Sequence, residues 1–146
     1  ANNGVRYRTH FVKAILDTNT GKVLQETQPE VMDVIEDRGD TFDLVRQGMI
    51  GVSETVSGLK NYPVTIACKT GTAQWQGTTS TGSFSGSDHA SFVLYAPADN
   101  PEIAISVYVE RGSQGGNLAN VCIPILDAYF SSSAKYETVA TENIAY

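Results

Sequence analysis

The stretch Val64-Thr65-Ile66-Ala67-Cys68-Lys69-Thr70-Gly71-Thr72-Ala73-Gln74 decides the fold of this chain. Its first five residues are apolar or β-branched, which is typical of a buried strand. A lysine, a glycine and two threonines come next, and a segment rich in Gly, Ser and Thr follows them. We therefore predict a strand over 64–68 that ends at Lys69, and a mobile surface loop from Trp75 to Asp88.

Two further apolar runs lie downstream, Ala90 to Ala96 and Ile103 to Val109, and a short polar turn joins them. They predict an antiparallel pair of strands, and their lack of alternation predicts that both faces are covered. From Leu118 to Tyr129 the apolar residues recur at helical spacing, with Asn117 as a plausible cap. Pro124 falls inside this pattern and predicts either a kink or a later start of the helix.

Upstream, the apolar segments Phe11–Leu16 and Val23–Gln25 flank a turn signal and predict a β-hairpin. A helix is expected over 42–52, with Asp40 or Thr41 as its cap. The order hairpin, helix, strand, loop, strand, strand, helix predicts an α+β fold, in which an antiparallel β-sheet is backed by a C-terminal helix.

Composition narrows the classes of function. The 146 residues are 41% hydrophobic, enough for a packed core, and the net charge of -6 without a Lys/Arg cluster argues against nucleic acid as a partner. Apolar runs are far shorter than the roughly 18 residues that span a bilayer, and the start lacks a signal pattern. Any anchoring segment is therefore expected outside these residues. Cys68 and Cys122 have no His or Cys at ligand spacing, so neither a metal nor another cofactor is predicted.

Several segments together resemble the C-terminal part of the transpeptidase domain of class B penicillin-binding proteins, and the resemblance covers nearly the whole chain. Lys-Thr-Gly alone is a weak signal, but the strand before it and Thr-Ala-Gln after it make it specific. The resemblance implies a partial penicillin-binding-protein/β-lactamase-like fold, with 1–130 as the C-terminal portion of the domain and 131–146 as a polar tail. The segments that carry it are Asn2–Tyr7 with the following hairpin, Val64–Gln74, Asp88-His89-Ala90, Tyr95-Ala96-Pro97, Ile103–Glu110 and Gly116–Phe130.

The same resemblance implies roles for five residues, with Lys69 and Thr72 catalytic. Lys69 would be a compact cation that fixes a carboxylate or a proton network. Hydroxyls of Thr70 and Thr72 would bind the carboxylate of a D-Ala-D-Ala stem or a β-lactam, and the N–H of Thr72 would complete an oxyanion hole. Gly71 would leave the strand edge open to an extended peptide, and Gln74 would lie at the rim of the substrate site.

Two motifs expected with Lys-Thr-Gly are missing or misplaced. Ser-x-Asn does not occur, and the two Ser-x-x-Lys matches, Ser57 to Lys60 and Ser132 to Lys135, lie before a Pro-containing turn and in the polar tail. Neither place suits a nucleophile. The resemblance thus implies a fragment of a peptidoglycan D,D-transpeptidase on the extracytoplasmic face of the bacterial cell membrane. The fragment alone is predicted inactive. Its expected partners are stem peptide, β-lactams, the missing N-terminal part of its own domain and a cell-wall synthesis complex.

Alternatives stay open at this point. The chain could belong to a serine β-lactamase or β-lactam sensor, or could be a non-catalytic module that binds a peptide or protein along its strand edge, although Lys-Thr-Gly-Thr-Ala favours a transpeptidase. For His10 and His89 a structural hydrogen bond is preferred over metal or acid–base chemistry. Asp88 is expected to act in a turn or cap. Trp75 could form a wall of the cleft or anchor its loop.

The sequence departs from the family pattern at two positions. Cys68 stands where Gly is common, and Ser91 stands where an aromatic residue often follows His-Ala. Strand alternation places Cys68 on the face opposite Lys69, toward the helix that carries Cys122. The two sulfurs could form a disulfide, but two buried free thiols are the preferred interpretation.

Overall fold

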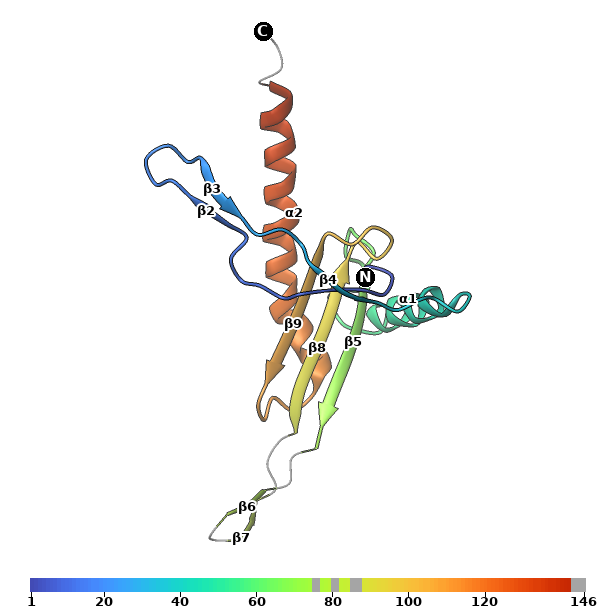
Figure 1. The fold of residues 1–146 in the computed structure, drawn as a ribbon. Coiled ribbons are helices and arrows are strands. Elements are labelled where there is room, and N and C mark those ends of the chain that lie inside the picture. Colours follow the sequence, from blue (N-terminus) through green and yellow to red (C-terminus); the bar gives the residue numbers. More distant parts are fainter. Residues whose placement is uncertain (75–76, 80–81, 85–87, 143–146) are drawn as a thin grey trace. The chain divides into compact units, whose positions relative to one another are not determined.

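The computed structural model describes residues 1–74, 77–79, 82–84 and 88–142 (Figure 1). The chain divides into two compact units, Ala1–Leu44 and Val45–Tyr146, which are considered one at a time below.

The first unit contains two short antiparallel strand pairs. Strand β2 (Ala14–Leu16) pairs with β3 (Val23–Glu26), which confirms the predicted hairpin. Strand β1 (Val5–Tyr7) pairs with β4 (Val31–Val34), a pairing that the sequence did not predict. Strands of three and four residues carry too little alternation to be recognised, and these two are separated by the whole hairpin.

Asp17 organises the hairpin turn. Its Oδ1 accepts hydrogen bonds from the N–H of Thr20 at 2.8 Å, the Thr20 hydroxyl at 2.9 Å and the N–H of Asn19 at 3.0 Å. These bonds lower the pKa of Asp17, those from Thr20 most strongly. Gly21 follows at a φ of 69°, a left-handed conformation that favours glycine. The turn signal in the sequence therefore has a direct structural basis.

Helix α1 (Thr41–Ser53) confirms the helix predicted over 42–52. The carboxylate of Asp37 accepts the N–H of Thr41 at 3.1 Å and the N–H of Phe42 at 3.4 Å. Both donors lie in the first turn, where they have no partner within the helix. Asp37 thus stabilises the start of the helix. Asp40, one of the two predicted cap residues, directly precedes the helix, and its carbonyl oxygen accepts the N–H of Leu44 at 2.9 Å.

The second unit is built on a three-stranded antiparallel sheet with the order β5-β8-β9. Strands β8 (His89–Ala96) and β9 (Ile103–Val109) confirm the predicted pair. Strand β5 (Ala67–Ala73) begins later than predicted and continues beyond Lys69. Each of its seven residues has a Cα partner on β8, from Ala67 opposite Tyr95 to Ala73 opposite His89. Lys69 therefore lies within the strand and does not end it.

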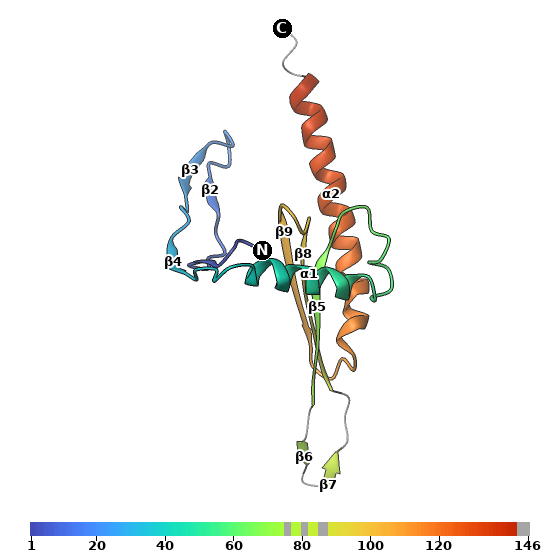
Figure 2. The same ribbon diagram turned by 90° about the vertical axis from the view of Figure 1, so that its right-hand side faces the viewer.

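One face of this sheet carries the core of the unit. The 3-10 helix η1 (Gly115–Leu118) leads into helix α2 (Ala119–Glu142), which lies along one side of the sheet in Figure 2. Helix α2 contains Pro124 and continues through Glu142, beyond Phe130, where the sequence predicted its end. The α+β arrangement with an antiparallel sheet and a C-terminal helix is confirmed. The central buried side chains are Cys68, Phe92 and Leu94 of the sheet, and Cys122 and Leu126 of α2.

The opposite face of the sheet is covered only in part within this unit. Met49 of α1 packs against a small cluster around Tyr95 at one end. Farther along, Val93 is 42% exposed and Tyr108 is 60% exposed. The prediction that both faces are covered is therefore not met by the second unit as the structure describes it.

The segment predicted as a mobile loop contains a short strand pair. Strand β6 (Gly77–Thr79) pairs antiparallel with β7 (Gly82–Phe84). Trp75, for which two roles were considered, lies outside the described residues. Across the described part of the chain, no helix combines the length and apolar character that a membrane span requires.

Candidate functional site

Strand β5 carries most of the residues singled out by the sequence, and it lies at an edge of the sheet. Among the described strands its only partner is β8. Successive side chains of a strand point to opposite faces, so Thr70 and Thr72 share the face on which Cys68 is buried. Lys69 lies on the other face. The two threonines and the lysine are thus separated by the pleat of the strand.

Thr70 and Thr72 line one pocket of about 550 Å³. Asp88 and the segment Ser113–Gly116 complete the described lining. The N–H of Gly115 donates to the hydroxyl of Thr72 at 3.4 Å, so the segment is joined to the strand beside the pocket. Threonine hydroxyls can both donate and accept hydrogen bonds. The pocket therefore offers donors for a small polar or anionic group.

The strand is crowded at Gly71. A Cβ atom added to Gly71 would lie 2.2 Å from Oγ of Ser91, its partner on β8. Cβ atoms do not come this close to other heavy atoms. A side chain at position 71 therefore requires the Ser91 hydroxyl to move aside, a constraint that the sequence did not reveal. Ser91 is small, but its hydroxyl fills the space beside the glycine.

Lys69 is exposed and is not lodged in the packed interior. Its Nζ donates a hydrogen bond of 2.6 Å to the carbonyl oxygen of Thr70. The ammonium group thus lies beside the strand, and Lys69 is not one of the described residues that line the threonine pocket. Gln74 follows directly after β5 and is also exposed. Of the five predicted residues, the structure brings Thr70 and Thr72 to one pocket, with Gly71 between them.

Asp88 was expected to act in a turn or cap, whereas the backbone hydrogen bond that the structure gives it is a long-range one. Its carbonyl oxygen accepts the N–H of Ser113 at 2.9 Å, which ties the start of β8 to the segment after β9. Asp88 is also one of the residues that line the threonine pocket. Ala90 pairs with Thr72, and Asp88, two residues before Ala90, falls on the same face. The register between β5 and β8 is the signal that could have placed Asp88 beside the threonine pocket.

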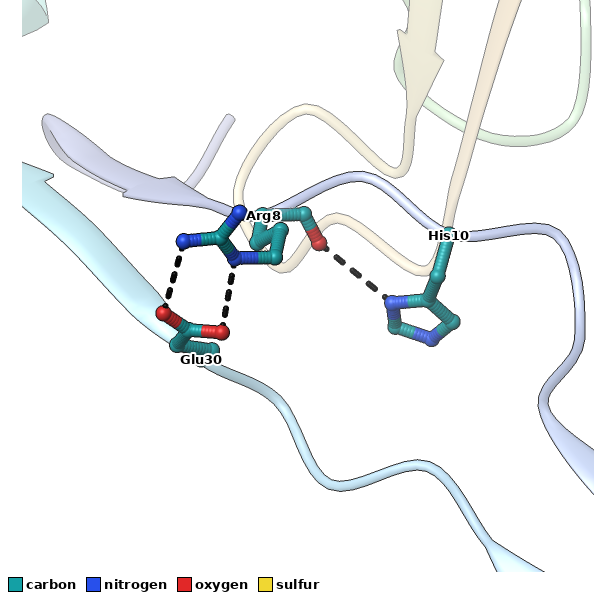
Figure 3. Close-up of polar contacts among 3 residues, drawn as sticks. All are labelled: Arg8, His10 and Glu30. Atoms are coloured by element: carbon teal, nitrogen blue, oxygen red, sulfur yellow. Dashed lines mark hydrogen bonds and ion pairs between the residues drawn. The ribbon is translucent and has the colours of Figure 1, made fainter.

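His10 belongs to the first unit and has a local structural role. Its Nδ1 lies 3.3 Å from the carbonyl oxygen of Arg8 and hydrogen bonds with it. The guanidinium of Arg8 binds Glu30 through two bonds, of 2.7 and 3.0 Å (Figure 3). His10, Arg8 and Glu30 are all exposed. The Arg8–Glu30 ion pair therefore contributes at most about 1 kcal/mol to the stability of the fold.

His89 also makes a structural contact. Its Nδ1 accepts the N–H of Arg111 at 3.3 Å, and its ring stacks on Tyr108 with a centroid separation of 5.9 Å. Within the described ranges no group of three or more His, Cys, Asp or Glu residues could hold a metal ion.

Cys68 and Cys122 are both fully buried, and both are free thiols in the structure. Burial is the main cause that raises the pKa of Cys68 to about 11, with Cys122 as a second cause. Burial also raises the pKa of Cys122. Two protonated thiols in one core agree with the preferred interpretation of the sequence.

The two formal Ser-x-x-Lys matches do not form a nucleophilic site in the structure. Ser57 is exposed in the turns between α1 and β5, and Ser132 lies on α2. Neither is among the described residues that line the threonine pocket.

Comparison with known proteins identifies relatives of the chain. The penicillin-binding protein transpeptidase domain matches residues 1–126. Penicillin-binding protein 2A of Bacillus subtilis is 30% identical over 97% of the chain and 22% of that protein. Peptidoglycan D,D-transpeptidase MrdA of Acinetobacter baumannii is 37% identical over 62% of the chain and 15% of that protein.

The fold is similar to that of a solved relative as well. Penicillin-binding protein 2B of Streptococcus pneumoniae has a TM-score of 0.66 and 28% identity, covering 88% of this chain and 23% of that one. The chain thus spans only a minor part of the length of these relatives. By sequence and by fold, it belongs to the family of penicillin-binding protein transpeptidase domains.

Proposed function

We propose that residues 1–130 form the C-terminal portion of the transpeptidase domain of a peptidoglycan D,D-transpeptidase, and that Thr70 and Thr72 bind the terminal carboxylate of a stem peptide or a β-lactam. The observation that carries the proposal is the pocket lined by these two threonines on an edge strand. Family membership and a relative named peptidoglycan D,D-transpeptidase support the class of reaction. We place the domain on the extracytoplasmic side of the membrane, where peptidoglycan is cross-linked.

The reaction needs a serine, which we place outside these residues. Its oxygen bonds to the penultimate D-alanine carbonyl carbon, the peptide C–N bond breaks, and the leaving D-alanine amine takes up a proton. An acceptor amine then bonds to the same carbon, the ester bond between that carbon and the serine oxygen breaks, and the serine oxygen takes up the proton that the amine loses. The product is a cross-linked stem peptide.

The chain contributes binding and electrostatic stabilisation to these steps. Hydrogen bonds from Thr70 and Thr72 to a carboxylate are charge-assisted and stronger than neutral ones. The N–H of Thr72 is suited to the oxyanion that forms during attack, and losing such a donor costs about 3 kcal/mol. The free edge of β5 can pair with an extended peptide backbone. The exposed ammonium of Lys69 adds positive potential beside the strand.

Labelled benzylpenicillin tests the proposal. The full-length protein that contains these residues should keep the label after denaturation, and the isolated 146-residue chain should not. Changing Thr70 and Thr72 together to Val should lower the acylation rate constant about 100-fold or more, because two bonds to a charged group are lost. Thr65→Val is the matched control, since Thr65 is exposed and lies just before β5.

Three results would contradict the proposal in different ways. A stable adduct on the isolated chain would place the nucleophile within these residues. No adduct on the full-length protein would exclude the acyl-serine mechanism and favour a binding module. Rapid release of hydrolysed penicillin would indicate a β-lactamase, because a transpeptidase remains acylated.

A further inference from the structure

The hydroxyl of Thr72 joins a buried donor to an exposed position on the strand. Thr72 is exposed, whereas Gly115 is buried, and the N–H of Gly115 donates to Oγ1 of Thr72 at 3.4 Å. Buried backbone N–H groups are nearly always paired in folded proteins. This N–H belongs to η1 and not to β5, so its position is set outside the strand that carries the hydroxyl. The bond therefore restrains the hydroxyl from a second element of the fold.

That bond gives the hydrogen of the hydroxyl a preferred direction. A threonine hydroxyl has one hydrogen to donate and two lone pairs that accept. The N–H of Gly115 occupies one lone pair of Thr72, so the O–H hydrogen points away from Gly115. A hydroxyl that already accepts a hydrogen bond is also polarised and becomes a stronger donor. Thr72 is thus prepared to donate to a negatively charged group in the pocket.

Gly115 comes this close to the strand because it has no side chain. A Cβ atom at position 115 would lie 2.5 Å from the carbonyl oxygens of Gly71 and Ser91, whereas Cβ atoms essentially never approach within 3.0 Å. Relieving these contacts requires a shift of about half an ångström between the segment and the strands. N–H···O bonds usually span about 2.7–3.2 Å, so a bond that is already 3.4 Å long does not survive such a shift. The close approach of Gly115 and the direction of the Thr72 hydroxyl are therefore linked.

We propose that Gly115 is a positioning residue for carboxylate recognition, and that its N–H orients the Thr72 hydroxyl as a donor to the carboxylate of a stem peptide or a β-lactam. Gly115 acts through Thr72 and needs no contact of its own with the carboxylate. The inference rests on the proposed function, because it takes Thr72 to be part of the carboxylate site. Its effect is expected for ligands with an ionised carboxylate, since charge-assisted hydrogen bonds are the strong ones.

Benzylpenicillin and its methyl ester separate this role from general damage to the fold, because they differ only at the carboxylate, which the ester leaves uncharged. The measurement is the second-order acylation rate constant of the full-length protein with each compound, and the ratio of the acid constant to the ester constant reports carboxylate recognition. In Gly115→Ala this ratio should fall about fivefold, the size expected when one hydrogen bond to a charged group is weakened. Thr72→Val should lower the ratio at least as much, and Thr72→Ser should retain it.

The variant that combines Gly115→Ala with Thr72→Val tests whether Gly115 acts through Thr72. Its ratio should equal that of Thr72→Val alone, because the hydroxyl that Gly115 orients is gone. Gly112→Ala is the matched control. A Cβ atom there would lie 2.9 Å from the Cβ atoms of Ala90 and Val109, so it crowds the same connection between β9 and η1. Gly112 is not among the described residues that line the threonine pocket, and this variant should keep the original ratio.

Amide hydrogen exchange at Gly115 tests the bond without altering the glycine. Exchange of this amide in the full-length protein should be faster in Thr72→Val than in the unaltered protein, because the acceptor of the N–H is removed. Thr72→Ser keeps the acceptor and should keep the original exchange rate. This measurement decides the question even where Gly115→Ala yields too little folded protein.

Four results would overturn the inference: an unchanged ratio in Gly115→Ala, an equal fall in Gly112→Ala, a further fall in the combined variant, or an unchanged exchange rate of the Gly115 amide in Thr72→Val. The proposed function survives each of them as long as Thr72→Val lowers the ratio. An unchanged ratio in Thr72→Val would instead contradict Thr72 as a carboxylate site. Failure of the unaltered protein to react with benzylpenicillin would contradict the proposed function, and the inference would fall with either.

Discussion

Gly115 lies directly against the backbone of Gly71. A Cβ atom added to Gly115 would lie 2.5 Å from the carbonyl oxygen of Gly71 and 2.9 Å from its nitrogen. The same atom would lie 2.5 Å from the carbonyl oxygen of Ser91. All three are backbone atoms of paired strands, which cannot move aside as a flexible side chain can. The contact between two glycines thus places the segment after β9 on the strand that carries the threonines.

Gly115→Ala should therefore destabilise the fold by about 1–3 kcal/mol, the usual cost of overpacking. Urea denaturation of the full-length protein would show this as a lower midpoint. Gly116→Ala is the control, because a Cβ there would meet only Cγ2 of Thr70, at an ordinary 4.0 Å. Equal midpoints for the two variants would contradict the close packing of Gly115.

Gly71→Ala and Ser91→Ala should show coupled effects on stability. The added methyl group in Gly71→Ala meets the Ser91 hydroxyl at 2.2 Å, so this variant should lose about 1 kcal/mol. Removing that hydroxyl in the double variant should recover much of the loss. A double-mutant cycle of unfolding free energies measures the coupling. Strict additivity would show that the Ser91 hydroxyl is not the atom that crowds Gly71.

Lys69→Met should lower the rate constant of acylation by benzylpenicillin about 100-fold in the full-length protein, if its ammonium supports proton transfer or the field of the site. Lys60→Met is the control, because Lys60 is exposed in the turns before β5. Equal rate constants for the two variants would remove Lys69 from the proposed mechanism.

Cys68 and Cys122 should both be alkylated only after denaturation. Under non-reducing conditions, mass spectrometry of the denatured chain should find two modified thiols. A mass that is two hydrogens lower and takes up no reagent would instead show a disulfide between them.

The raised pKa of Cys68 also predicts how stability depends on pH. Its pKa is about 11 in the fold and near 9 without the fold, so the folded state holds its proton more tightly. This contribution is fully present below about pH 9 and is lost as the pH rises toward 11. Urea midpoints of the unaltered protein should fall more steeply over this range than those of Cys68→Ala. Parallel pH profiles would contradict a buried thiol.

Local sequence patterns were sufficient to predict much of the secondary structure of the second unit. The apolar runs of β8 and β9 and the helical spacing in α1 were visible in the sequence because each is a regular, local signal. The pairing of β1 with β4 was not visible in the sequence, since it depends on residues far apart in the chain. The end of β5 was also misplaced, because its polar residues are strand residues only through pairing with β8.

The motif predicted which residues form the site, and their roles stay a prediction, whereas the structure shows how these residues are arranged. The threonines were found from the motif, and they do share a pocket. The sequence interpretation assigned Lys69 and the threonines to the same substrate site, whereas strand alternation places the lysine on the face opposite both hydroxyls. Asp88 reaches the pocket because of the register between β5 and β8. The segment Ser113–Gly116 reaches it because the chain turns at Arg111 and Ser113, whose φ angles are 55° and 67°. A turn with positive φ at residues other than glycine is hard to recognise from the amino-acid sequence.

The hydrogen bond and close packing at Gly115 have a mechanical consequence. Gly115 is the first residue of η1, which runs without a break into α2. The threonine-bearing strand is therefore attached, through η1, to the start of α2, the longest helix among the described residues. A ligand bound at Thr72 would be held next to the start of this helix, so the stability of the helix start and the affinity of the pocket share the same contact.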